Sequence, residues 1–293
     1  MQRPTIRVAG VCSVGLGLVS GVAIVLTPTT VRSSPVWVVW AALAITLTTT
    51  AGAVFAYGLG RWAELTALRP VRARDVVLPL AGLLAAGVLA ALVSIVVTAM
   101  AHQAKADWSA VRGWALTLLA GLGTMPAIAT MYGIRQAAGD TSAVSAKGEQ
   151  VAALVASRGL LQRLLAAVGS LVALATLALG AAFAVRQSLP TPSPGPQPAP
   201  QTVLIFGGAG SMLVALAYGP AATALRNRGR RLCDELFPVH EADEAEAILR
   251  IAEDRNKLEQ LLGVDRTVVT DLQTGLTILG PLVASAAASL LPP

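Results

Sequence analysis

Four arginines within six positions form the densest group of positive charges in the chain. They lie in the stretch RNRGRR, residues 226 to 231, as Arg226, Arg228, Arg230 and Arg231. Guanidinium groups bind phosphate through paired N–H donors, so this cluster could contact nucleic acid or the phosphates of membrane lipids. Asp234 and Glu235 follow at once, and no aromatic residue for base stacking lies among the arginines. We therefore expect lipid headgroups as the partner, or a topology anchor, and no nucleic acid.

Hydroxyl groups and helix-breaking residues are the other features that could act on a solute. They occur in two apolar runs, as Thr46, Thr48, Thr49 and Thr50 in one and as Gly121, Gly123 and Pro126 in the other. Threonine hydroxyls can line a pathway or bond across to a neighbouring helix. A Gly/Pro break can place a kinked helix beside a cavity. Both patterns predict either a solute pathway or close helix packing, and packing is the commoner use.

Catalytic and metal-binding patterns are missing from the apolar runs. The chain has two histidines and two cysteines, His102, His240, Cys12 and Cys233, and their separations fit neither a metal site nor a disulfide framework. No phosphate-binding loop and no nucleophile-elbow motif occurs. We therefore expect no enzymatic activity, no metal and no cofactor.

The composition is that of a membrane protein. Of the 293 residues, 55% are hydrophobic and only 13% are charged, whereas soluble domains have about 25% charged residues. So few charges could not cover the surface of a soluble protein of this length. The bias toward Ala, Val, Leu, Arg and Gly is typical of a bacterial protein from a GC-rich genome.

Charged residues divide the chain into apolar runs that are long enough to cross a bilayer, which takes about 20 residues. Six charge-free runs cover residues 8–26, 35–60, 76–101, 113–134, 164–185 and 201–225. A seventh run, 272–291, includes Gln273, Thr274 and Pro281, so it could also be a re-entrant or interfacial helix. The predicted fold is an all-α, polytopic transmembrane bundle of six spans plus a seventh.

The distribution of Lys and Arg predicts how the bundle is oriented. With a cytoplasmic N-terminus, 18 of the 22 basic residues lie on the cytoplasmic side, as the positive-inside rule requires. We expect an inner (plasma) membrane protein with an external C-terminus. Residues 135–163 then form a cytoplasmic extension. Residues 186–200 form an external proline-rich loop, either a stiff spacer or a ligand for a proline-binding partner.

The largest polar segment contains one predicted helix, residues 241–263. Opposite charges four residues apart support it, in the pairs Glu246–Arg250, Arg250–Asp254, Glu253–Lys257 and Arg255–Glu259. Gly263 is a suitable helix stop. An apolar stripe includes Ile248, Ile251, Leu258, Leu261 and Leu262. The stripe could bind a protein partner or a second copy of the chain, or it could pack on the cytoplasmic end of its own bundle.

These features predict three parts: a transmembrane bundle at 1–225, a cytoplasmic charged helical segment at 226–271, and a C-terminal transmembrane helix at 272–293. We expect a non-enzymatic, multi-pass integral membrane protein that acts by interaction or signal relay through the helical segment. The alternative is a permease or channel-like transporter of a neutral or apolar solute. Membrane lipid is an expected partner in both cases.

Overall fold

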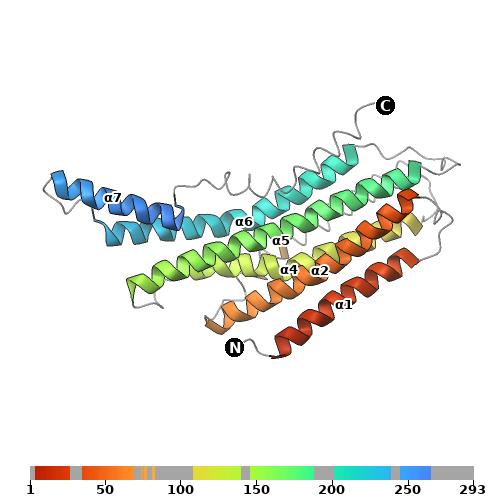
Figure 1. Cartoon of the computed structure of the whole chain (residues 1–293), viewed down its shortest axis with the longest axis horizontal. Helices are drawn as coiled ribbons and strands as arrows, with labels where there is room; N and C mark the ends of the chain where they lie inside the picture. Colours follow the sequence, from red (N-terminus) through yellow and green to blue (C-terminus); the bar gives the residue numbers. More distant parts are fainter. Residues whose placement is uncertain are drawn as a thin grey trace.

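All regular secondary structure in the described part of this computed structural model is α-helical. The structure describes residues 4–26, 35–68, 74, 76–77, 81–82, 108–139, 146–187, 201–238 and 245–264. The helices are α1 (Pro4–Leu26), α2 (Pro35–Leu68), α4 (Trp108–Gly139), α5 (Lys147–Gln187), α6 (Gln201–Leu236) and α7 (Ala245–Leu262) (Figure 1).

Four of the described helices are long and apolar enough to cross a membrane. The qualifying stretches are Pro35–Thr66 in α2, Arg112–Gly139 in α4, Lys147–Arg186 in α5 and Phe206–Leu236 in α6. Helix α1 adds a shorter apolar stretch, Gly10–Leu26. The expectation of an all-helical fold is thus confirmed, and four of the predicted spans coincide with helices that are long and apolar enough to cross a membrane. The third predicted span, 76–101, lies mostly outside the described residues, and the seventh, 272–291, lies outside them entirely.

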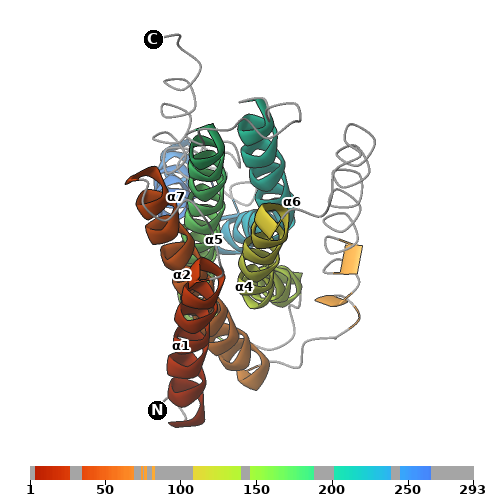
Figure 2. The ribbon, with the colours of Figure 1, turned by 90° about the vertical axis from the view of Figure 1, so that its right-hand side faces the viewer.

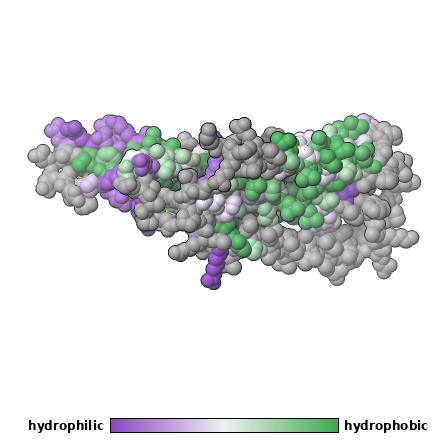
Figure 3. Space-filling view, turned by 90° about the horizontal axis from the view of Figure 1, so that it is seen from below, coloured by the Kyte–Doolittle hydropathy of each residue, from purple (hydrophilic) through white to green (hydrophobic). Residues whose placement is uncertain are grey.

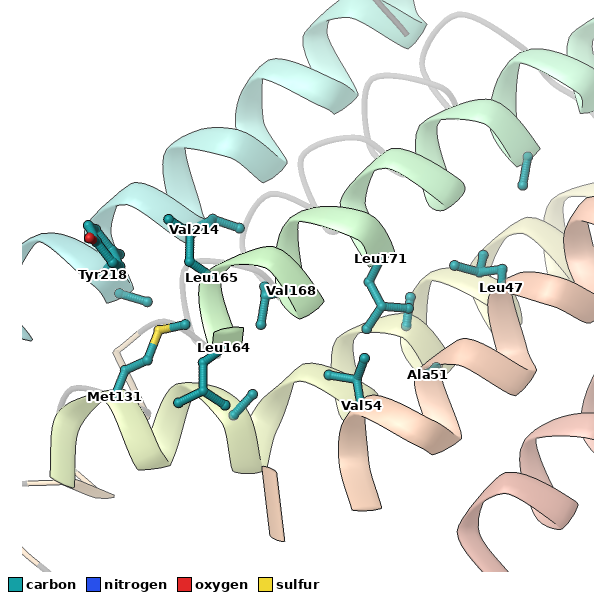
Figure 4. Packing of buried hydrophobic residues seen from close by; sticks show 14 of the residues in the cluster. Leu47, Ala51, Val54, Met131, Leu164, Leu165, Val168, Leu171, Val214 and Tyr218 are labelled. Carbon is teal, nitrogen blue, oxygen red and sulfur yellow. The ribbon is translucent and has the colours of Figure 1, made fainter. Parts of the chain in front are cut away.

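The long helices lie side by side in an elongated bundle (Figures 1 and 2). Helix α2 contacts α1, α4 and α5, while α6 contacts α4 and α5 on the other side. The shared core is mostly aliphatic, with Leu47 and Val54 from α2, Met131 from α4, Leu164, Val168 and Leu171 from α5, and Val214 and the aromatic Tyr218 from α6 (Figure 4). This core joins the four long helices into one unit.

Helices α5 and α6 are longer than a membrane crossing requires. With 41 and 36 residues, they measure about 60 and 54 Å, whereas the hydrocarbon core is about 30 Å thick. Both extend past the other helices at the same end of the bundle, where α7 lies against α6 (Figure 1). We call this the polar end, because hydrophilic residues gather there (Figure 3).

Apolar side chains gather away from the polar end on the face that Figure 3 shows, and large ones are exposed on several helices. Val11 and Leu16 of α1 are 75% and 71% exposed, and Leu118 of α4 and Met212 of α6 are 63% and 62% exposed. In water such a surface would be a strong aggregation liability. Against lipid tails it costs little, so these faces suit direct contact with the bilayer.

Glycines let α1 approach α2 until the two backbones touch. A Cβ added at Gly17 would meet the carbonyl of Thr48, and one at Gly52 would meet the carbonyl of Ser13. Gly21 lies against the Thr48 side chain in the same way. The small-xxx-small pattern Gly17–Gly21 is therefore used inside the chain, as is common in multi-span bundles.

The opposite side of α2 meets α4 through a second close approach. A Cβ at Gly58 would lie 2.5 Å from the Ala127 amide nitrogen, and one at Gly123 would lie 2.7 Å from the Ala51 carbonyl oxygen. The hydroxyl of Thr130 donates to the Pro126 carbonyl of its own helix at 2.7 Å and lies 3.2 Å from the carbonyl of Gly58. Gly58 and Gly123 each face the backbone of the other helix. A side chain added at either position could therefore not be accommodated by rotating a neighbouring side chain.

We predict that Gly58→Ala destabilises the bundle, because its new methyl group would overlap the α4 backbone. Overpacking of this kind costs about 1–3 kcal/mol. The free energy of unfolding, measured in mixed detergent micelles, should fall by that amount. Gly121→Ala is the matched control, since nothing lies within 4 Å of its added Cβ. Equal stability of the two variants would contradict the close approach of α2 and α4.

Candidate functional site

Helix α7 is held at the polar end by a small apolar cluster of its own. Cys233 of α6, Leu262 of α7 and Val264 are buried there, and Leu258 packs beside them. Helix α5 contributes Val151 and Leu154 to the same cluster. The polar extensions of α5 and α6 therefore act as the platform on which α7 rests.

The carboxyl end of α7 is closed by a Schellman motif. Gly263 has a φ of 56°, its N–H donates to the Gln260 carbonyl at 3.0 Å, and the Val264 N–H donates to the Glu259 carbonyl at 2.9 Å. This confirms the predicted stop at Gly263, where the left-handed backbone favours glycine. The Arg158 Nη1 of α5 donates to the remaining Leu262 carbonyl at 2.5 Å, so a cation sits at the negative end of the helix.

Polar contacts hold the same helices together. Arg255 of α7 lies 2.7 Å from the Asp234 carboxylate of α6 and 2.8 Å from that of Glu259. The hydrogen bond to Glu259, with the nearby charge of Asp234, raises the pKa of Arg255. The ammonium of Lys147 on α5 donates to the Glu235 carbonyl at 3.1 Å. Of the predicted intrahelical pairs, Arg255–Glu259 and Glu253–Lys257 are present, each at 2.8 Å.

The arginine cluster does not end α6, which continues through it to Leu236. Its four arginines have three different surroundings. Arg228 donates to the Gln150 side chain of α5 at 2.7 Å, Arg230 and Arg231 are exposed, and Arg226 is half-buried. Gly229 lies between them, buried, where an added Cβ would be 2.8 Å from Val264 Cγ2. The absence of a side chain at Gly229 thus leaves room for the residues at the carboxyl end of α7 to pack against α6.

A pocket of about 30 Å³ lies between α5, α6 and the end of α7. Arg158 and Arg226 are the charged residues that line it, Tyr218 lines it as well, and Leu161, Leu225 and Leu262 are among its apolar walls. No acidic side chain is among the described residues that line it. The pocket therefore combines two cations with hydrocarbon surface.

The apolar stripe of α7 is used in two ways. Leu258 and Leu262 face the docking cluster, whereas Ile248 and Ile251 are half-buried and belong to neither described core cluster. Leu261 is 60% exposed and Leu249 is 71% exposed. The amino-terminal half of α7 projects past the ends of α5 and α6 (Figure 1). Residues 241–244 of the predicted helix lie outside the described residues.

The threonines of α2 bond within their own helix. Thr46 donates to Ala42 at 2.8 Å, Thr48 donates to Ala44 and Ile45 at 3.2 and 3.0 Å, and Thr49 donates to Ile45 at 2.8 Å. Thr50 is half-buried on the same helix. These hydroxyl protons therefore already have acceptors, and Thr48 also forms part of the contact with α1.

The Gly/Pro group of α4 lies in a helix that is continuous from Trp108 to Gly139. Gly123 and Pro126 face α2, where they permit the close approach to Ala51 and Gly58, while Gly121 is exposed. The Gly/Pro spacing predicted either close packing or a broken helix. In the structure α4 is unbroken, and Gly123 and Pro126 take part in its packing against α2.

Titratable groups do not gather into a metal site within the described ranges, where no group of three or more His, Cys, Asp or Glu could hold an ion. Cys12 is exposed on α1 and Cys233 is buried in the cluster that holds α7. His102 and His240 lie outside the described residues.

Comparison with known proteins finds no matching family model, no matching curated protein and no matching solved structure.

Two important residues of the polar end were not singled out from the sequence. Arg158 was counted only as a cytoplasmic charge, although it binds the end of a helix more than 100 positions away. Gly229 was read as part of an arginine cluster. Glycine is unfavourable inside a helix, so a glycine between the arginines of a continuous helix indicates a close packing contact. That was the signal by which the sequence could have identified Gly229.

Cys233 provides a natural probe of α7 docking. With Cys12→Ser as background, we predict slow maleimide labelling of the buried Cys233 thiol in the folded protein. Leu262→Ala should speed labelling by about tenfold or more, because truncating a buried leucine costs about 2–5 kcal/mol and increases local opening.

Leu261→Ala is the control for this measurement. It removes the same atoms from a side chain that is 60% exposed, next to one that is only 7% exposed. Its labelling rate should stay close to that of the parent. If both variants label alike, the docked position of α7 is wrong.

Proposed function

We propose that this chain is a non-enzymatic, multi-pass protein of the inner membrane that binds a protein partner, or relays a signal to one, through α7. The observation that supports the proposal is the division of α7 into a docked half and a projecting half. The docked half is fixed by Leu262, Gly263 and Arg255. The projecting half leaves Leu249 71% exposed, beside the half-buried Ile248 and Ile251 on an amphipathic helix.

The geometry suits recognition by a groove. An amphipathic helix presents apolar side chains at helical spacing to a partner, and docking of its other half limits the entropy lost on binding. Glu246, Arg250 and Glu253 place charges of both signs around the projecting half, so a polar rim can surround its apolar side chains. We prefer this function to a permease because the hydroxyls of Thr46, Thr48 and Thr49 already bond within α2.

The proposed topology has six spans and a seventh, with the N-terminus and the polar end in the cytoplasm and the C-terminus outside. It is supported by the concentration of basic residues on the side that holds the polar end. The polar extensions of α5 and α6 and the docked α7 would then form a compact cytoplasmic platform.

Reporter fusions test this topology. Alkaline phosphatase fused after Pro194 or after Pro293 should be active, because both points are proposed to lie outside, and a fusion after Pro238 should be inactive. A green fluorescent protein fused at the same three points should show the opposite pattern. Phosphatase activity after Pro238 would reverse the orientation, and inactivity only after Pro293 would remove the seventh span.

Partner binding is tested by photo-crosslinking in cells. A photoreactive residue in place of Leu249 should give a discrete crosslinked protein product. The double variant Ile248→Ser/Ile251→Ser should weaken that product by about tenfold, as expected for the loss of interface anchor residues.

Two controls accompany this experiment. A photoreactive residue in place of Leu118, which is 63% exposed on the apolar surface, should give no such product. Leu261→Ser should leave the Leu249 product unchanged, because Leu261 lies in the docked half. A Leu249 product that persists unchanged in the double variant would refute partner binding through the projecting half.

A further inference from the structure

The pocket at the polar end holds two cationic side chains whose N–H donors are not all used. The Nε of Arg226 is buried and has no hydrogen-bond partner among the described residues. Arg158 uses Nη1 for the Leu262 carbonyl, which leaves the rest of its five donors. Leaving a buried charged donor without an acceptor costs free energy, so the pocket favours an acceptor that enters from outside.

The positive charges of Arg158 and Arg226 are not balanced by acidic side chains among the described residues. In the described structure Arg255 has Asp234 and Glu259, and Arg61 has Glu64, but neither Arg158 nor Arg226 belongs to an ion pair there. The described residues that line the pocket include no acid. An anion would therefore meet two guanidiniums and no repelling carboxylate from the pocket walls.

The volume of the pocket and the residues that line it indicate which class of anion it could bind. A volume of about 30 Å³ admits about two water-sized groups, which matches two oxygens of a phosphate group, and the pocket is partly open for the rest of the molecule. Paired guanidinium donors match phosphate geometry well. The apolar walls from Leu161, Leu225 and Leu262 suit a ligand with hydrocarbon next to its phosphate.

The position of the pocket relative to the membrane points to the same ligand. Arg226 is the first charged residue after the charge-free run 201–225, so it lies where the hydrocarbon core gives way to headgroups. We propose that Arg158 and Arg226 bind the phosphate group of an anionic ligand in this pocket, and that the phosphodiester of an anionic membrane phospholipid supplies it. This site is separate from the projecting half of α7, so it stands whether or not α7 binds a partner.

The test uses the full-length protein in a neutral detergent and three probes: dioctanoyl phosphatidylglycerol, dioctanoyl phosphatidylcholine and inorganic phosphate. Binding is followed by thermal unfolding, and bound lipid is counted by native mass spectrometry. Phosphatidylglycerol should bind saturably and raise the unfolding temperature, and phosphatidylcholine should not. Arg226→Gln should weaken phosphatidylglycerol binding by about tenfold or more, the usual effect of losing a charged hydrogen-bond donor.

The matched control is Arg230→Gln, which makes the same charge change four residues further along α6 at an exposed position. It should change the affinity by less than about twofold, as expected for a screened surface charge. Arg158→Gln should also weaken binding, and slow labelling of Cys233 in that variant shows that α7 is still docked. Stabilisation by inorganic phosphate that depends on Arg226 would support the phosphate site and identify a soluble ligand as its source.

Two results would overturn the proposal. One is an equal loss of binding in Arg226→Gln and Arg230→Gln, which would mean a diffuse attraction of the surface for anions. The other is a wild-type protein that prefers neither phosphatidylglycerol nor phosphate over phosphatidylcholine. Neither result would affect the crosslinking test of α7, because that test changes only residues of α7 and Leu118 of α4.

Discussion

Backbone contact between α2 and two of its neighbours, α1 and α4, is the constraint on which the bundle depends. Apolar side chains drive little association in lipid, because lipid tails are equally apolar, so helices gain most from close van der Waals contact. Gly17 and Gly52 bring α1 against α2, and Gly58 and Gly123 bring α4 against α2. Once α2 is fixed between them, Leu47 and Val54 can meet the aliphatic side chains of α5 in one core.

A second glycine contact, at the polar end, has a different physical basis. There the surroundings are polar, so burial of Cys233, Leu262 and Val264 contributes hydrophobic free energy as well as packing. Gly229 makes room for Val264, and Gly263 turns the chain away. The arginines nearby have different contacts. Arg255 pairs with Asp234 of α6, Arg158 donates to the last carbonyl of α7, and Arg226 lines the pocket.

These two regions explain why the function is proposed at the polar end. Between them the helices present aliphatic side chains to each other and to lipid, and the hydroxyls of Thr46, Thr48 and Thr49 are bonded within α2. The polar end contains the exposed half of an amphipathic helix and two cations without acidic partners in the described structure. Both proposals, of a protein partner and of a phosphate ligand, rest on these features of the polar end.

The sequence by itself determined the helical class, four of the spans and the stop at Gly263. Those properties depend on local composition: apolar runs of sufficient length, opposite charges at a spacing of four, and a glycine at a left-handed position. It also identified Gly121, Gly123 and Pro126 as packing candidates, but it could not tell which helix each one faces. The partners depend on how helices cross, and that information is spread over segments that are distant in the chain.

Only the tertiary structure decided the roles of the arginines and of the α7 stripe. Arg226, Arg228, Arg230 and Arg231 look alike as a string of like charges, yet one faces a pocket, one bonds to Gln150 and two are exposed. Leu261 and Leu262 are equally apolar neighbours, yet one is exposed and the other buried. The physical reason is that a helix presents adjacent residues about 100° apart, so the environment of each side chain is set by what packs against the helix from elsewhere in the chain.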